Sequence, residues 1–135
     1  MTKNTKATRQ TVNTGTVWEE VASFSRGLRV GQHIFIAGTT ASGPNGIVGK
    51  DDPAQQMQFI LERIEGAIQQ LGGRLENIVR TRIYVSEIKH WESVARIHGE
   101  KFKNIRPVCT LVEAHLVGEC LVEVEAEAIV DDKEF

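Results

Sequence analysis

The chain has 135 residues, of which 41% are hydrophobic and 25% are charged, and its formal net charge is −2. This balance is typical of a single folded domain, residues 1–135, with one hydrophobic core. The slight acidic excess argues against nucleic-acid binding, because domains that bind nucleic acid usually gather a basic excess on one face.

Residues 1–10 carry polar and basic side chains without an apolar run, and we expect them to be flexible. They do not have the pattern of a signal peptide, and no later segment approaches the ~18 consecutive apolar residues of a membrane span. A cytoplasmic location without membrane contact is the simplest expectation, and free thiols at Cys109 and Cys120 fit it. If the last two strands form a hairpin that turns at Val117–Gly118, the two cysteines lie about 20 Å apart along it, too far for a disulfide.

The first part of the chain predicts two strands and a loop. Phe24–Val30 has an extended pattern, Gly31-Gln32 indicates a hairpin turn, and His33–Ala37 is a short strand with apolar groups on both faces. Residues 38–49 are rich in Gly, Thr, Ser, Asn and Pro, which indicates a loop.

The segment Pro53–Leu71 is the clearest predicted helix. Asp52 can cap it, and proline suits its first position because the missing N–H has no partner there. Apolar residues recur at steps of three and four and form one stripe: Met57, Ile60, Leu61, Ile64, Ala67, Ile68 and Leu71. Gly72-Gly73 can end the helix, because glycine tolerates positive φ.

The second part of the chain predicts a strand, a helix and two final strands. Ile78–Val85 alternates in polarity, and Val79 is expected on the same face as the other odd-numbered residues. Trp91–Phe102 has a shorter helical stripe, which Pro107 stops, since the residue before a proline avoids the helical region. Two strands complete the domain: Cys109–His115 and Cys120–Val130.

The expected sheet has a face that its helices do not cover. Two helices can cover one face only, yet His33–Ala37 is apolar on both sides, which is typical of burial on both. We therefore expect a second subunit on the uncovered face. The three glutamates of segment 123–127 share one face of the last strand, and Arg80 and Arg82 lie on a neighbouring strand. These charges form either a solvated ladder or a polar cleft at a subunit boundary.

Several segments carry the pattern of a known family: Val30-Gly31 through Gly38, Pro53–Leu71 with Gly72-Gly73, Ile78–Val85, Arg106-Pro107 with Val112-Glu113-Ala114, and Val122-Glu123-Val124-Glu125-Ala126. From Phe24 to Val130 the chain resembles the Rid family, the YjgF-like reactive-intermediate deaminases. The resemblance implies an α+β, chorismate-mutase-like fold, with two helices on one face of a mixed sheet. It also implies a homotrimer with clefts between subunits, and hydrolysis of enamines and imines to 2-oxo acids and ammonia without metal or cofactor.

Four positions of that pattern bear on the chemistry. Glu123 stands where the family has a glutamate that helps to position the attacking water. Cys109 replaces the arginine that grips the substrate carboxylate in the best-known branch, and Leu111 takes a place often held by cysteine. Phe24 stands where that branch has a cleft tyrosine. These departures suggest a divergent branch with a changed ligand.

Other candidate site residues follow from position alone. Arg106 precedes Pro107 and could reach the same anion, or it could be a surface arginine near a helix end. Thr39 and Thr40 follow a strand end and can line the cleft by analogy with the family. Trp18 either covers the cleft of a neighbouring subunit or packs to hold the N-terminal segment in place. The 4 histidines are scattered without metal-ligand spacing, so we expect no metal.

Two functions of different kinds remain open. The chain is either a cleft hydrolase that acts on small imines or enamines, or a metabolite-binding or regulatory trimer without catalysis. The missing arginine at position 109 favours the second. Cys109 could be a nucleophile only with a lowered pKa, and packing is the commoner role of such a cysteine. Members of the family have also been described as ribonucleases, which the acidic balance of this chain disfavours.

Overall fold

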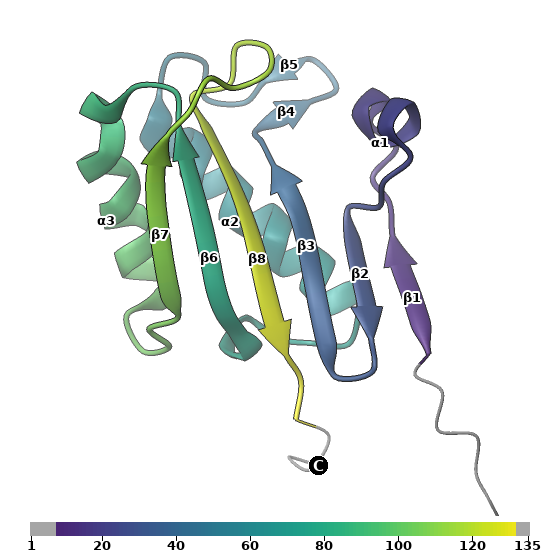
Figure 1. Ribbon diagram of the computed structural model, residues 1–135. Helices are drawn as coiled ribbons and strands as arrows, with labels where there is room; N and C mark the ends of the chain where they lie inside the picture. Colours follow the sequence, from purple (N-terminus) through teal and green to yellow (C-terminus); the bar gives the residue numbers. More distant parts are fainter. Residues whose placement is uncertain (1–7, 132–135) are drawn as a thin grey trace, which may run out of the picture.

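The computed structural model describes residues 8–131 and consists of a six-stranded sheet with helices packed against one face (Figure 1). The order of strands across the sheet is β1-β2-β3-β8-β6-β7. The strands are β1 Arg9–Val12, β2 Gly27–Val30, β3 His33–Thr39, β6 Ile78–Val85, β7 Val108–Glu113 and β8 Val122–Ile129. The helices are α1 Val17–Ala22, α2 Pro53–Gln70 and α3 Trp91–Phe102. The expected α+β class, with α2 and α3 on one face, is confirmed.

Helix α2 matches the predicted helix to within one residue. The Asp52 side chain accepts a hydrogen bond from the backbone N–H of Gln55, and Pro53 occupies the first turn. The chain leaves the helix through Gly72, whose φ of 84° is open to glycine because it lacks a Cβ. The predicted apolar stripe is buried against the sheet.

Strand β8 lies in the middle of the sheet and runs antiparallel to both β3 and β6. Its alternate residues Val122, Val124, Ala126 and Ala128 face the helices and are buried. The glutamates of segment 123–127 therefore point to the opposite face, on which no helix of the described residues packs (Figure 1). We call this the open face.

The open face carries both charged and apolar side chains. Arg80 lies 3.7 Å from Glu127, and Arg82 lies 3.4 Å from Glu127, which confirms the expected cross-strand pairs. These pairs are more than one-third exposed, so in a single protomer each contributes little stability. Phe35 and Ile129 are 45% and 43% exposed on the same face. Apolar groups exposed beside a polar ladder are typical of a surface that meets a partner.

The pairing of the last two strands differs from the expected hairpin. Strand β7 pairs in parallel with β6, and Cys109 lies opposite Thr81 rather than opposite a residue of β8. The reason is that α3 forms the crossover between β6 and β7, and such a crossover joins parallel strands. Cys109 and Cys120 are both free, as expected.

The expected face of Val79 was wrong. Ile78 pairs with Ala128 and Arg80 with Glu127, so Val79 is the extra residue of a β-bulge. The bulge turns Val79 outward, and its side chain is 40% exposed.

The N-terminal part and the expected loop contain further elements. Strand β1 begins at Arg9, inside the range 1–10 for which we expected flexibility, and pairs with β2; residues 1–7 of that range lie outside the described residues. Helix α1 follows, capped by Thr16. The expected loop 38–49 includes the end of β3 and a small hairpin, β4 Ser42–Gly43 and β5 Gly46–Ile47.

Candidate functional site

A hollow of about 360 Å³ opens at the end of the sheet where β3 ends and β8 begins. Its lining includes residues of α1 and of the β4–β5 hairpin, two elements that lie at the top of Figure 1. The lining residues are Trp18, Phe24, Arg26, Gly38, Thr40, Ser42, Ile47, Val117, Gly118, Glu119, Cys120 and Glu123. An apolar wall with a few convergent polar groups is typical of a small-molecule site. We call this hollow the Glu123 pocket.

The carboxyl group of Glu123 is the central acidic group of this pocket. Strand β8 presents it on the open face, and Gly38 of β3 lies so close that an added Cβ would overlap its Oε2 atom. Burial raises the pKa of Glu123; the charge of Arg26 opposes this shift, and that of Glu125 adds to it. The shift brings the carboxyl group closer to the pKa at which one group can both accept and return a proton near neutral pH.

The guanidinium of Arg26 lies beside Glu123 and is almost fully buried, with the residue 6% exposed. It donates to the carbonyl of Gly38, to Oγ1 of Thr39 at 3.2 Å, and to a carboxylate oxygen of Glu19 at 3.4 Å. Its Nε is also buried but has no hydrogen-bond partner among the described residues. A buried donor without a partner is rare in folded proteins, and a bound ligand is one group that can supply the missing acceptor.

Glu19 joins α1 to this cluster. Its carboxylate accepts hydrogen bonds from the backbone N–H of Thr14 at 2.9 Å and from the hydroxyl of Thr16 at 2.7 Å, and it pairs with Arg26 at 3.4 Å. Burial acts to raise the pKa of Glu19, but the hydrogen bonds from Thr14 and Thr16 and the charge of Arg26 outweigh it and lower the pKa to about 2.

This lowered pKa predicts an acid-dependent loss of stability. Because the folded pKa of Glu19 lies below its ordinary value of 4.5, its contribution is complete above that value and disappears as the pH falls towards about 2. In Glu19→Gln we expect this part of the pH dependence to vanish. Urea unfolding at pH 7, 4 and 3 measures it, with Glu20→Gln on the exposed side of α1 as the control. The same fall with pH in Glu19→Gln as in the unchanged protein would contradict the assignment.

Three of the predicted site residues meet at this end of the sheet. Phe24 and Glu123 line the pocket, and the Phe24 ring packs with its centroid 5.4 Å from the Arg26 guanidinium carbon. Thr39 is 1% exposed and lies behind the lining, where its hydroxyl accepts from Arg26. Its neighbour Thr40 lines the pocket itself.

The other three predicted site residues lie elsewhere in the protomer. Cys109 and Leu111 pair with buried, helix-facing residues of β6, so their side chains project to the helix side of the sheet. Glu123 projects to the open face and lies two strands away, roughly 10 Å at the usual strand spacing. Within one protomer these residues, and Arg106 before β7, form no common site with Glu123.

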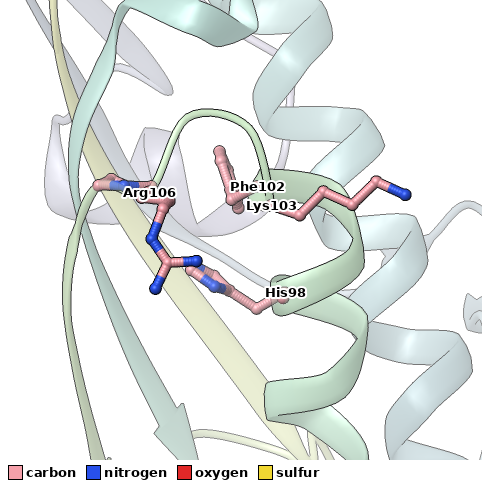
Figure 2. A pocket seen from close by; sticks show the side chains of 6 residues that line it. His98, Phe102, Lys103 and Arg106 are labelled. Carbon is pink, nitrogen blue, oxygen red and sulfur yellow. The ribbon is translucent and has the colours of Figure 1, made fainter.

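Arg106 lines a separate hollow of about 300 Å³ near the start of β7. Figure 2 shows its guanidinium directed towards His98, while Lys103 extends away and pairs with Glu100 at 3.1 Å. His98 is half-buried, and its Nε2 lies 2.8 Å from Oγ1 of Thr81. Burial lowers the pKa of His98. His98 is therefore a hydrogen-bonded histidine of the helix–sheet packing.

Sequence reasoning named four of the residues that line the Glu123 pocket, Trp18, Phe24, Thr40 and Glu123, and missed the others, among them Arg26 and Gly38. Gly38 gave the clearest available signal, because a glycine that ends a buried strand often marks a close approach of another group. Trp18, for which two roles were open, is 51% exposed and lines the pocket.

Within residues 8–131 no group of three or more His, Cys, Asp or Glu side chains could hold a metal ion. The same part of the chain has no helix that is long and apolar enough to cross a membrane.

Comparisons with known proteins agree on one family. The model of a family described as Endoribonuclease L-PSP matches residues 15–130. An uncharacterised protein of Streptomyces coelicolor is 34% identical over 119 residues, which cover 87% of this chain and 89% of that protein. A RutC family protein of Pyrococcus abyssi is 26% identical, and the match covers 80% of this chain and 87% of that protein.

Solved structures share the fold over nearly the whole chain. A member of the YjgF/YER057c/UK114 family from Mycobacterium tuberculosis is 42% identical with a TM-score of 0.83, covering 91% of this chain and 100% of that chain. A protein of the conserved Rid family from Yersinia pestis is 25% identical with a TM-score of 0.80, with coverage of 91% and 100%.

Proposed function

The chain belongs to the YjgF-like Rid family, and from this membership and the Glu123 pocket we propose that it hydrolyses small imines or enamines as a homotrimer. The observation that carries the proposal is a half-buried carboxyl group with a raised pKa at the family's glutamate position, in a hollow large enough for a small metabolite. Family membership supports a protein that acts on small molecules.

The reaction needs a group that moves protons at one carbon–nitrogen bond. Water adds its oxygen to the imine carbon, the π electrons pass to nitrogen, and the carboxylate of Glu123 takes the proton that water releases. Glu123 returns this proton to nitrogen, which gives a carbinolamine. Glu123 then takes the proton of the new hydroxyl group and passes it to the amino nitrogen, so that the carbon–nitrogen bond breaks as the carbonyl forms and ammonia leaves. A carboxyl group whose pKa is raised by burial is suited to these transfers.

A second copy of the chain would complete the site. The open face exposes apolar groups beside the charge ladder, which supports a subunit contact there. In a homotrimer, a neighbouring copy would bring its edge strand β7, with Arg106 just before it, beside the Glu123 pocket, which a single protomer cannot do. A monomer in light scattering would contradict this part of the proposal.

Ammonia release from freshly generated 2-aminoacrylate tests the function. We expect the protein to accelerate release by roughly 10²-fold or more over the uncatalysed rate, the usual range of general acid–base catalysis. We also expect kcat/KM to rise with pH through a pKa above 4.5, because Glu123 accepts a proton only when ionised. A rate equal to the uncatalysed one would refute hydrolysis; ligand binding without turnover would instead indicate a metabolite-binding trimer.

A further inference from the structure

We propose that Arg26 binds the carboxylate of the ligand in the Glu123 pocket, so that each protomer carries its own anion anchor and selects small 2-oxo or 2-imino acids. The proposal rests on the proposed function only for the identity of the reacting group, an imine or carbonyl held near Glu123. The anchor itself follows from the contacts of Arg26.

The hydrogen bonds of Arg26 leave part of its donor set unused. Of the five N–H groups of a guanidinium, three are engaged, with the carbonyl of Gly38, the hydroxyl of Thr39 and the carboxylate of Glu19. The Nε–H is buried and has no partner among the described residues. Nε and Nη2 form one edge of the guanidinium, and that edge matches the two oxygens of a carboxylate.

The buried, unpaired donor lies in a residue that lines the hollow. Arg26 and Glu123 both line the Glu123 pocket. A small ligand whose reacting carbon lies at Glu123 is therefore also close to Arg26. In a 2-imino acid the carboxylate is attached directly to the imine carbon. One short ligand can therefore meet both groups at once, which orients the imine carbon towards Glu123.

The charge around the pocket is compatible with an anion. Arg26 pairs with Glu19, and a second guanidinium, that of Arg63, donates to the carbonyl of Thr40 at 3.2 Å. Burial lowers the pKa of Arg63, and Arg26 lowers it further while Glu19 raises it, so the two arginines share one electrostatic environment. Arg26 thus opposes the negative charge of both Glu19 and Glu123, and Arg63 adds a second positive charge near Glu19, so an added carboxylate does not meet a purely acidic site.

The rest of the lining sets the size and polarity of the ligand. Trp18, Phe24, Ile47 and Val117 supply apolar surface around the polar groups, and the hollow measures about 360 Å³. This combination fits a short carboxylic acid with a small apolar side chain. Arg106, by contrast, lines another hollow of the protomer.

Binding of two matched probes tests the anchor. We expect 2-oxobutanoate to bind the unchanged protein in calorimetric titration and raise its melting temperature. We expect 2-butanone, which has the same carbonyl without the carboxylate, to bind at least 10-fold more weakly. Failure of 2-oxobutanoate to bind, or equal binding of the two probes, would overturn the proposal without any substitution in the protein.

Substitutions then locate the anchor. In Arg26→Lys the positive charge beside Glu19 remains but the planar donor edge is lost, and we expect the affinity for 2-oxobutanoate to fall at least 10-fold. Arg96→Lys makes the same change on the exposed side of α3 and should leave binding unchanged. Glu19→Gln breaks the ion pair but keeps Arg26, so it should retain the preference for the carboxylate; loss of that preference would indicate a structural role of the pair.

These measurements distinguish Arg26 from Arg106 as the anchor, and they distinguish ligand binding from imine hydrolysis. Full affinity in Arg26→Lys, or loss of affinity in Arg106→Gln but not in Arg26→Lys, would overturn the proposal. Arg26-dependent binding without ammonia release would refute the proposed hydrolysis and leave the anchor standing. Ammonia release that shows no preference for substrates with a carboxylate would refute the anchor and leave the proposed hydrolysis standing. If Arg26→Lys does not fold, the comparison of 2-oxobutanoate with 2-butanone in the unchanged protein and in Glu19→Gln still tests the preference for a carboxylate.

Discussion

Alanine in place of Gly38 is expected to abolish imine hydrolysis as completely as glutamine in place of Glu123. Both changes should lower kcat/KM by roughly 10²-fold or more, because each removes the proton-transfer group from its position. The Cβ that Gly38→Ala adds would overlap Oε2 of Glu123, and the carboxyl group is the far end of a side chain that can rotate away. The fold should therefore survive while the carboxyl group moves.

The comparison of the two variants makes this prediction specific. Gly38→Ala should unfold at nearly the same urea concentration as the unchanged protein, since Gly38 has no positive φ that an alanine would strain. Gly66→Ala is the matched control, because its added Cβ would meet nothing within 4 Å in the middle of α2. Normal turnover in Gly38→Ala, measured by ammonia release, would show that the close approach to Glu123 has no catalytic importance.

Local signals in the sequence were sufficient for α2 and for the faces of β8. In α2 the cap at Asp52, the apolar stripe and Gly72 all indicate the same helix, so local preference and tertiary burial agree. In β8 strict alternation reveals which side chains are buried, and the glutamate of the family motif lies where a ligand can reach it.

Long-range pairing could not be predicted from the same signals. A turn-like sequence at Val117–Gly118 suggested a hairpin, but α3 returns the chain to the outer edge of β6 and makes β7 parallel. Helix α1 has six residues, too few for periodicity to reveal it. The residues of the Glu123 pocket were predicted only in part, because some of them meet through contacts that the sequence does not reveal. Arg26 contacts Glu19, seven residues earlier, and that contact exists only once the chain after α1 has folded back so that α1 lies near the start of β2.

Leucine in place of Gln56 is expected to lower the free energy of unfolding by about 2 kcal/mol or more, because two partly buried backbone groups lose their partners. Gln56 is 0% exposed. Its Nε2 donates to the carbonyl of Gly49 at 3.0 Å, and its Oε1 accepts from the backbone N–H of Leu121 at 3.0 Å. One side chain of α2 thus holds both the segment after β5 and the segment that enters β8.

The same two bonds connect stability to the site. Leu121 directly follows pocket residues 117–120 and precedes Glu123 by two positions, so loss of its partner should loosen one wall of the Glu123 pocket. We therefore expect Gln56→Leu to weaken binding of 2-oxobutanoate even under conditions where the variant remains folded. Gln58→Leu makes the same change at an exposed position of α2, where the amide donates to Glu62, and should alter the unfolding free energy by less than about 0.5 kcal/mol. Equal urea midpoints for the two variants would show that Gln56 does not hold these segments together, and the wall of the pocket would then need another support.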